Sequence, residues 1–184
     1  RKYGVSSKNR WVIFFPNFND LYLISLPCYL IKMNSISSKF AFDLPSIGLG
    51  CMSLPTDYIS AKTIVDEAFD YGISFFDTAD LYQQGLNEQF LGKALKGKRS
   101  QVILATKVGN QWNKEKTAWF WNPRKAYMMQ AVEESLKRLR TDYIDLYQLH
   151  GGTLDDPWDE IVEAFELLKT QGKIRAYGIS SIRP

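Results

Sequence analysis

Residues 143–180 read YIDLYQLHGGTLDDPWDEIVEAFELLKTQGKIRAYGIS, and this stretch indicates the fold class. Residues 143–150 form an apolar run of strand length, and 174–180 form a second. Between them, Asp156-Pro157 begins a helix that Gly172 ends. The helix is expected to bury Ile161, Val162, Phe165 and Leu168, which have the spacing of one helical face. A strand, a helix and a strand in succession predict two parallel strands joined by a crossover helix.

The same alternation extends toward the N-terminus. Three further runs have strand character: 46–51, 73–77 and 102–108. The segments between them show helical periodicity, and we expect Ser60 and Asn122-Pro123 to begin the first and third helices. Five strands alternating with four helices through short connections predict an α/β fold with a parallel sheet.

Two architectures fit such a sheet: an open, doubly wound sheet and a parallel (β/α)8 TIM barrel. A doubly wound sheet would carry a glycine-rich phosphate turn after its first strand, but the sequence there, CMSLPTDYIS, lacks one. Asp77, Lys107 and His150 lie at or near the carboxyl ends of three different strands, which face the active site of a barrel. We therefore predict a TIM barrel truncated after about its fifth strand, because a whole barrel needs at least about 200 residues.

Residues 1–39 differ from the rest and are expected to form an irregular segment, with the barrel part occupying 40–184. The stretch 11–31 is apolar enough to raise the question of a membrane element, but prolines, asparagines and one acidic residue interrupt it. We expect no membrane element and no barrel element before about residue 40. Because the chain does not begin with Met, Met33 is an alternative start, and residues 1–32 would then lie upstream of the protein.

The composition excludes several classes of protein. With 45% hydrophobic and 23% charged residues, the chain is typical of globular proteins and not of disordered ones. Two cysteines exclude a disulfide scaffold and indicate a reducing compartment, for which the cytoplasm is the default. A single histidine argues against a histidine-rich metal site, and no metal is expected. Outside residues 1–32 basic and acidic residues nearly balance, so no nucleic-acid partner is expected.

Four residues with proton-transfer chemistry follow three successive strands: Asp77, Tyr82, Lys107 and His150. A lysine in a buried strand needs a partner, and Asp77 on the preceding strand is the natural one. Lys107 beside Tyr82 would lower the pKa of the phenol, and a neutral His150 would donate a hydrogen bond to a substrate oxygen. Each residue alone has a structural explanation as a turn, packing or strand-end residue. Their combination predicts proton transfer to a carbonyl oxygen or from an alcohol.

Five motifs carry a family resemblance: FFDTADLY, NEQFLGKAL, VILATKVG, SLKRLRTDYIDLYQLH and KIRAYGIS. In this order, from about Ile47 to Pro184, they resemble the aldo-keto reductase superfamily, and most of all the bacterial general reductases whose fourth strand ends in YQLHGG. The resemblance implies a TIM barrel that reduces aldehydes or ketones with NADPH. It implies four roles: Tyr82 as the general acid, Lys107 as the residue that lowers its pKa, Asp77 as the anchor of Lys107, and His150 as the residue that orients the carbonyl.

The resemblance also implies where NADP(H) binds. The family commonly has Ser-Asn at the end of the fifth strand, where this chain has Ser180-Ser181, and Asp77 is expected at the cofactor as well. The family's other cofactor contacts come from strands after Pro184. The preference for NADPH over NADH is therefore implied by the family alone.

Three interpretations remain open. The complete protein is a carbonyl reductase with a small-molecule substrate, or it is a non-catalytic regulatory subunit of the same fold, or this chain is an inactive fragment. The intact set of four residues favours the enzyme, whereas the missing strands predict little activity for the chain alone. The sequence does not indicate an oligomeric state. Trp112, Trp119 and Trp121 follow the third strand, where they either line an apolar pocket or cover the barrel.

Overall fold

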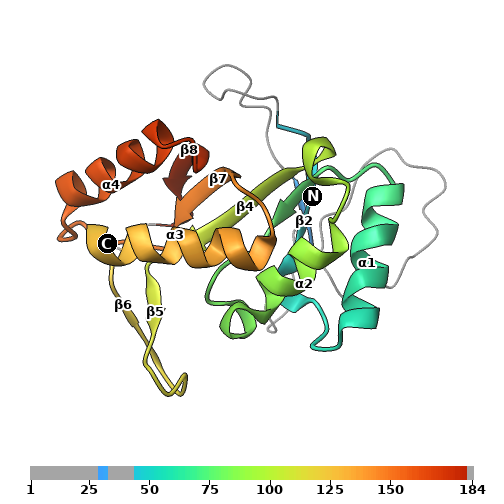
Figure 1. The fold of residues 1–184 in the computed structure, drawn as a ribbon, viewed down its shortest axis with the longest axis horizontal. Coiled ribbons are helices and arrows are strands. Elements are labelled where there is room, and N and C mark those ends of the chain that lie inside the picture. The colour runs from blue at the N-terminus through green and yellow to red at the C-terminus, as the bar shows by residue number, and fades with distance from the viewer. Residues whose placement is uncertain (1–28, 33–43, 182–184) are drawn as a thin grey trace, which may run out of the picture.

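The computed structural model describes residues 29–32 and 44–181. Its main sheet contains five parallel strands in chain order. They are β2 (Ile47–Gly50), β3 (Phe75–Asp77), β4 (Ile103–Val108), β7 (Ile144–Leu149) and β8 (Ile174–Ile179). A sixth strand, β1 (Tyr29–Lys32), pairs antiparallel with β2 at one edge. The five predicted strands are all present, each within a few residues of its expected bounds (Figure 1).

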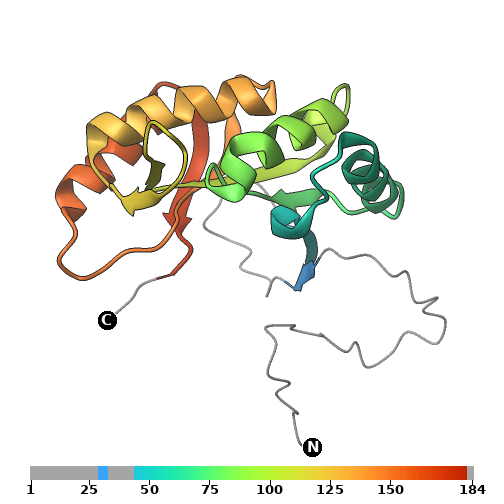
Figure 2. The same cartoon turned by 90° about the horizontal axis from the view of Figure 1, so that it is seen from below.

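Four α-helices follow the first four parallel strands and lie on the same face of the sheet (Figure 2). They are α1 (Tyr58–Asp70), α2 (Leu86–Ala94), α3 (Lys125–Leu139) and α4 (Trp158–Thr170). A doubly wound sheet would place helices on both faces and reverse its strand order at a switch point. Neither feature occurs among the residues that the structure describes (Figure 2), and the arrangement is that of the first five strands of a (β/α)8 barrel, as predicted.

Short elements complete the described chain. Three 3₁₀-helices follow β2, precede α2 and precede β4: η1 (Cys51–Ser53), η2 (Tyr82–Gly85) and η3 (Arg99–Gln101). After β4 the chain forms a two-stranded antiparallel hairpin from β5 (Asn110–Trp112) and β6 (Trp119–Trp121). The three tryptophans that follow the third predicted strand lie in this hairpin, which the sequence pattern did not indicate.

Two helix boundaries and one buried position differ from expectation. Asp57, not Ser60, caps α1: its carboxylate accepts the backbone N–H of Ser60 at 2.8 Å. The third helix begins at Lys125, two residues after Pro123. Val162 on α4 is 46% exposed, because the apolar stripe that packs on the sheet consists of Ile161, Ala164, Phe165 and Leu168.

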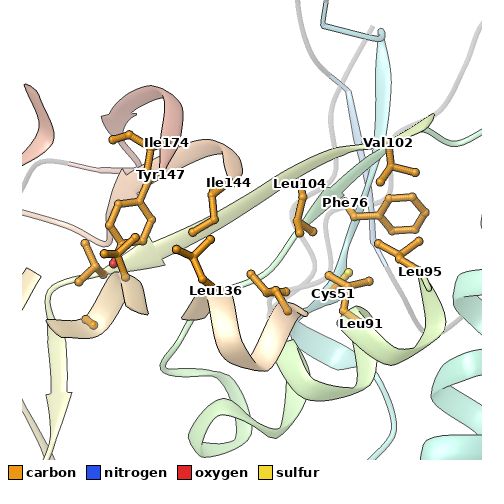
Figure 3. Packing of buried hydrophobic residues seen from close by; sticks show 14 of the residues in the cluster. Cys51, Phe76, Leu91, Leu95, Val102, Leu104, Leu136, Ile144, Tyr147 and Ile174 are labelled. Atoms are coloured by element: carbon orange, nitrogen blue, oxygen red, sulfur yellow. The ribbon is translucent and has the colours of Figure 1, made fainter. Parts of the chain in front are cut away.

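The hydrophobic core lies between the sheet and the helices. Phe76 and Leu104 on neighbouring strands pack against Leu91 of α2, and Tyr147 lies farther along the same layer near Leu136 (Figure 3). A second, smaller cluster on the opposite face of the sheet contains Phe75, Ala105, Leu146 and Ala176. This second cluster occupies the side that becomes the interior of a barrel, and it marks the face on which the site residues are found.

Helices α2 and α3 approach each other closely at Gly92. A Cβ added to Gly92 would lie 2.5 Å from the carbonyl carbon of Leu139, so only glycine fits there. This contact sets how near α2 comes to α3, and α2 follows directly on the segment that carries Tyr82.

The strand β1 lies outside the predicted barrel part, since it precedes residue 40, and it lines the outer edge of β2. Most of the predicted irregular segment 1–39 and the alternative start Met33 lie outside the described residues. Within the described ranges, no helix combines the length and the apolar character that crossing a membrane requires.

Candidate active site

The alternation of side chains along the strands places the predicted residues on one face. Residues two apart on a strand share a face, and Ala105, Leu146 and Ala176 belong to the inner cluster. Lys107 follows Ala105 by two residues, and His150 follows Leu146 by four. The register pairs Lys107 with Gln148 and Gln148 with Gly178, so these residues form the next layer toward the carboxyl end.

Lys107 and Asp77 form a short ion pair in this layer. Nζ of Lys107 donates to Oδ2 of Asp77 at 2.6 Å and to the backbone carbonyl of Thr78 at 2.8 Å. The Lys107 side chain is 8% exposed and that of Asp77 is 15% exposed. The predicted pairing of the buried lysine with the preceding strand is therefore present, and Thr78 adds a contact that the sequence analysis missed.

Tyr82 reaches the same place from η2. The next two residues, Gln83 and Gln84, adopt left-handed backbone conformations with φ of 50° and 58°. Side-chain contacts hold this unusual turn: Nε2 of Gln83 donates to the carbonyl of Leu54 at 2.6 Å, and Nε2 of Gln84 donates to the carbonyl of Lys116 at 3.0 Å. These contacts hold the strained backbone of η2, the element that begins with Tyr82.

The Tyr82 ring lies close to both Lys107 and His150. Nζ of Lys107 is 5.3 Å from the ring centroid of Tyr82, and the rings of Tyr82 and His150 meet edge to face at 5.6 Å. The structure therefore brings together Asp77, Tyr82, Lys107 and His150, which are separated by up to 73 positions in the sequence.

Burial dominates the electrostatics of two of these residues. Burial raises the pKa of Asp77 above its ordinary value, and the charge of Lys107 counteracts part of that rise. Burial also raises the pKa of Tyr82, and Lys107 again counteracts it. Lys107 therefore acts on the phenol in the expected direction, but the expected net lowering of the Tyr82 pKa is not found in this chain, because burial outweighs the lysine.

His150 is held as a neutral imidazole. Burial, followed by repulsion from the Lys107 charge, lowers the pKa of His150 to about 4. Its backbone N–H donates to the carbonyl of Val108 at 2.7 Å, which fixes the residue beside the end of β4. The Nδ1 atom is buried and has no hydrogen-bond partner among the described residues. A neutral imidazole offers one N–H donor and one acceptor nitrogen.

The end of β8 carries the predicted cofactor residues beside His150. The backbone N–H of Ser180 donates to the carbonyl of Leu149 at 3.0 Å, and Ser180 and Ser181 are both exposed. Gly178 lies two residues earlier on the inner face, and a Cβ built on it would meet nothing within 4 Å. Exposed hydroxyls beside an open stretch of strand fit a carboxamide ligand, whose oxygen and nitrogen they can bond.

The tryptophans after β4 do not act alike. Trp119 is half exposed on the hairpin. Trp121 instead packs on Gly109, whose φ is 120° and whose added Cβ would lie 2.5 Å from the Trp121 ring. The indole N–H of Trp121 donates to Oδ1 of Asp156 at 2.8 Å, in the segment before α4. At least one of the three therefore joins two loops.

The sequence analysis missed several polar residues that lie around this set. Gln148 pairs with Lys107 in register and shares its face. Asn87 and Glu88 are fully buried at the start of α2, although their types predict exposure. The spacing of Gln148, two residues before His150, is a signal that could have identified it. In the part of the chain that the structure describes, no group of three or more His, Cys, Asp or Glu residues could hold a metal ion.

Comparison with known proteins agrees with this geometry. A model of the Aldo/keto reductase family matches residues 46–184. An uncharacterized oxidoreductase of Bacillus subtilis, YqkF, is 57% identical over 142 residues, which are 77% of this chain and 46% of that protein. Among solved structures, the holo form of the aldo-keto reductase AKR11C1 from Bacillus halodurans is 66% identical with a TM-score of 0.73. That match covers 74% of this chain and 46% of the other.

A Klebsiella pneumoniae aldo-keto reductase solved in complex with NADPH is 35% identical with a TM-score of 0.66. The match covers 80% of this chain and 50% of the Klebsiella pneumoniae chain. This chain belongs to the aldo/keto reductase family, and it spans less than half the length of the curated relatives that it matches. The resemblance found in the sequence motifs and the barrel fold are thereby confirmed.

Proposed function

We propose that the complete protein reduces aldehydes or ketones to alcohols with NADPH, through Asp77, Tyr82, Lys107 and His150. One observation carries the proposal: a buried ion pair, a phenol and a neutral imidazole from different strands and loops converge at the carboxyl end of the parallel sheet. In barrel enzymes this end carries the catalytic residues. The family membership supports the same reaction class.

In this reaction the Tyr82 phenol donates a proton to the carbonyl oxygen while the carbonyl carbon is reduced. The Lys107 ammonium stabilises the phenolate that remains, and Asp77 keeps the ammonium in place at 2.6 Å. His150, being neutral, donates a hydrogen bond that orients the carbonyl oxygen. A bound nicotinamide cofactor would supply the hydride, so that the substrate would gain one hydride from the cofactor and one proton from Tyr82.

Ser180 and Ser181 are the residues of this chain that would hold the carboxamide of the cofactor. Their exposure beside His150 and the open space at Gly178 support this assignment. Two relatives from Klebsiella pneumoniae, solved with NADP and with NADPH, support the choice of NADPH as the cofactor. The cytoplasmic location remains part of the proposal and rests on the low number of cysteines.

The test is steady-state reduction of a simple aromatic aldehyde by the complete protein, followed through NADPH absorbance. Tyr82→Phe should lower kcat by about 10²–10⁴-fold and leave NADPH affinity nearly unchanged, because it removes one proton donor without changing the ring. Tyr71→Phe is the matched control, since Tyr71 is 69% exposed on the surface and should keep full turnover.

Each alternative interpretation predicts a different result. A non-catalytic regulatory subunit would bind NADPH and show no turnover even in the unmodified complete protein. An inactive fragment is the outcome if only the 184-residue chain is inactive while the complete protein turns over. Turnover that Tyr82→Phe leaves intact would show that another group donates the proton.

A further inference from the structure

A set of buried polar side chains lies behind the ion pair, on the helix side of the sheet. Thr78 follows Asp77 and Thr106 precedes Lys107, so each threonine is the neighbour of one member of the pair. Both are completely buried. Because adjacent strand residues point to opposite faces, Thr106 faces the helices while Lys107 faces the barrel interior.

Asn87, the second residue of α2, holds the first of these neighbours. The Thr78 hydroxyl donates to Oδ1 of Asn87 at 2.7 Å, and Nδ2 of Asn87 donates to the backbone carbonyl of Cys51 at 2.7 Å. One side chain thus joins the segments that follow β2 and β3. The backbone carbonyl of the same Thr78 accepts a hydrogen bond from Nζ of Lys107. Asn87 therefore tethers the residue that also contacts the lysine.

Glu88, the next residue of α2, holds the second neighbour. The Thr106 hydroxyl donates to Oε1 of Glu88 at 2.6 Å, and Nε of Arg138 on α3 donates to Oε2 at 2.6 Å. The Glu88 side chain is fully buried, and that of Arg138 is 20% exposed. A buried carboxylate needs such a partner, since removing one member of a buried pair leaves an uncompensated charge.

The backbone is shaped to allow this pair. Gly85 precedes α2 with a φ of 87°, and a Cβ added there would lie 2.8 Å from Cδ of Arg138. A residue other than glycine would therefore be strained and would displace Arg138. Arg138 also contacts Glu134, four residues before it on α3, at 3.6 Å, but its buried partner is Glu88.

We infer that Asn87 and Glu88 are positioning residues, which set the placement of β3 and β4 where Asp77 meets Lys107. The inference rests on the proposed function for its catalytic meaning, but the tethers themselves are contacts within this chain. Each hydroxyl bond is buried, so breaking it leaves an unsatisfied group and favours opening of the local structure. A tether on each strand holds the ammonium against Asp77 and Thr78.

The test measures how accessible the Lys107 amine is, and it needs no enzymatic activity. The complete protein is treated briefly with an amine-acetylating ester at neutral pH, and peptide mass spectrometry gives the rate at Lys107 relative to the exposed Lys114. Thr106→Val removes the hydroxyl and keeps the shape of the side chain. It should raise the relative rate at Lys107 roughly five-fold, as expected when one buried hydrogen bond is lost. Asn87→Leu should raise it similarly, and Thr106→Ser should restore the parent rate.

Thr141→Val is the matched control for a general loss of stability. Its hydroxyl accepts Nε of Arg99 at 2.9 Å and donates to the carbonyl of Tyr143 at 3.1 Å, before β7 and away from Lys107. It should lower the melting temperature without changing the Lys107 rate. The inference is overturned if Thr106→Val labels at the parent rate, or if Thr141→Val raises the rate equally. If Asn87→Leu does not fold, the labelling rates of Thr106→Val and Thr106→Ser decide the test. An inactive but correctly labelled protein would count against the proposed function only.

Discussion

Lys107 reaches Asp77 diagonally across the sheet, because the register pairs Asp77 with Ala105 and not with Lys107. The ammonium therefore lies over the end of β3, where the carbonyl of Thr78 also accepts it. This diagonal contact brings the charge to the segment that continues into η2 and Tyr82. The ion pair is consequently part of the route by which the sheet end and the phenol are held together.

Lys107→Met should abolish most of the activity of the complete protein. Burial raises the pKa of Tyr82, and Lys107 opposes that rise. Asp77, the partner of Lys107, raises the same pKa, so removing the lysine would leave both effects unopposed by it. We expect kcat to fall by about 10²–10⁴-fold, with Lys114→Met on the hairpin loop as an unaffected control. Reduction rates across pH provide the measurement, and a variant with the parent rate and pH profile would refute the role of Lys107.

Asp77→Asn should be milder than Lys107→Met at the same pH. The lysine keeps its charge and its 2.8 Å contact with the carbonyl of Thr78, so the phenol still has a cation beside it. A loss of roughly ten-fold in kcat is expected, together with a lower melting temperature, because one partner of a buried pair is gone. Comparing both variants in one assay is decisive: an Asp77→Asn loss as large as that of Lys107→Met would mean that the carboxylate itself is required.

Stability should fall in weak acid because of His150. Its pKa is about 4 in the folded chain and about 6.5 in an unfolded one, so between these values only the unfolded state binds the proton. Above about pH 6.5 His150 is neutral in both states and costs no stability. As the pH falls from about 6.5 to about 4, the free energy of unfolding should decrease by roughly 1–3 kcal/mol because of this group. Urea unfolding at pH 7 and pH 4.5 measures the decline.

His150→Gln isolates this contribution. The raised pKa values of Asp77 and Asp80 act in the opposite direction, since the folded state then binds protons more readily than the unfolded one. They remain in the variant, so the difference between parent and variant belongs to His150. Equal losses in both chains would show that the histidine is not held neutral.

Gly92→Ala should destabilise the chain by about 1–3 kcal/mol, because the new methyl group meets the Leu139 backbone at 2.5 Å and pushes α2 away from α3. Gly178→Ala serves as the comparison for stability alone, since its Cβ would lie in open space. Denaturant midpoints of both variants give the answer. A Gly92→Ala midpoint equal to that of the parent would mean that the two helices can separate without cost.

The strands and the convergence of Asp77, Tyr82, Lys107 and His150 could be predicted because their signals are local and strong. An apolar strand such as 102–108 interrupted by one lysine is unusual, and it pointed directly to a buried partner. The polar residues of α2 could not be found in this way. Asn87 and Glu88 look like ordinary exposed helix residues, and only their partners in the assembled fold explain their burial. Asn87 bonds to Thr78 and to the carbonyl of Cys51, and Glu88 bonds to Thr106 and Arg138. The prediction that Val162 is buried was wrong for a different reason. Helix α4 has more apolar residues than its buried stripe can hold, and Val162 lies outside that stripe.

The sequence also could not show whether the pKa of Tyr82 is raised or lowered. Spacing indicates that a lysine is near, but the degree to which the surrounding side chains exclude water depends on the assembled fold.

The bond from Trp121 to Asp156 has a mechanical consequence. It fastens the hairpin above β4 to the loop above β7, and the stacking of Trp121 on Gly109 anchors the same hairpin at its base. Two loops that follow different strands are therefore joined by one side chain. The hairpin cannot swing as an independent flap, because both loops must shift together or the indole must first release its carboxylate.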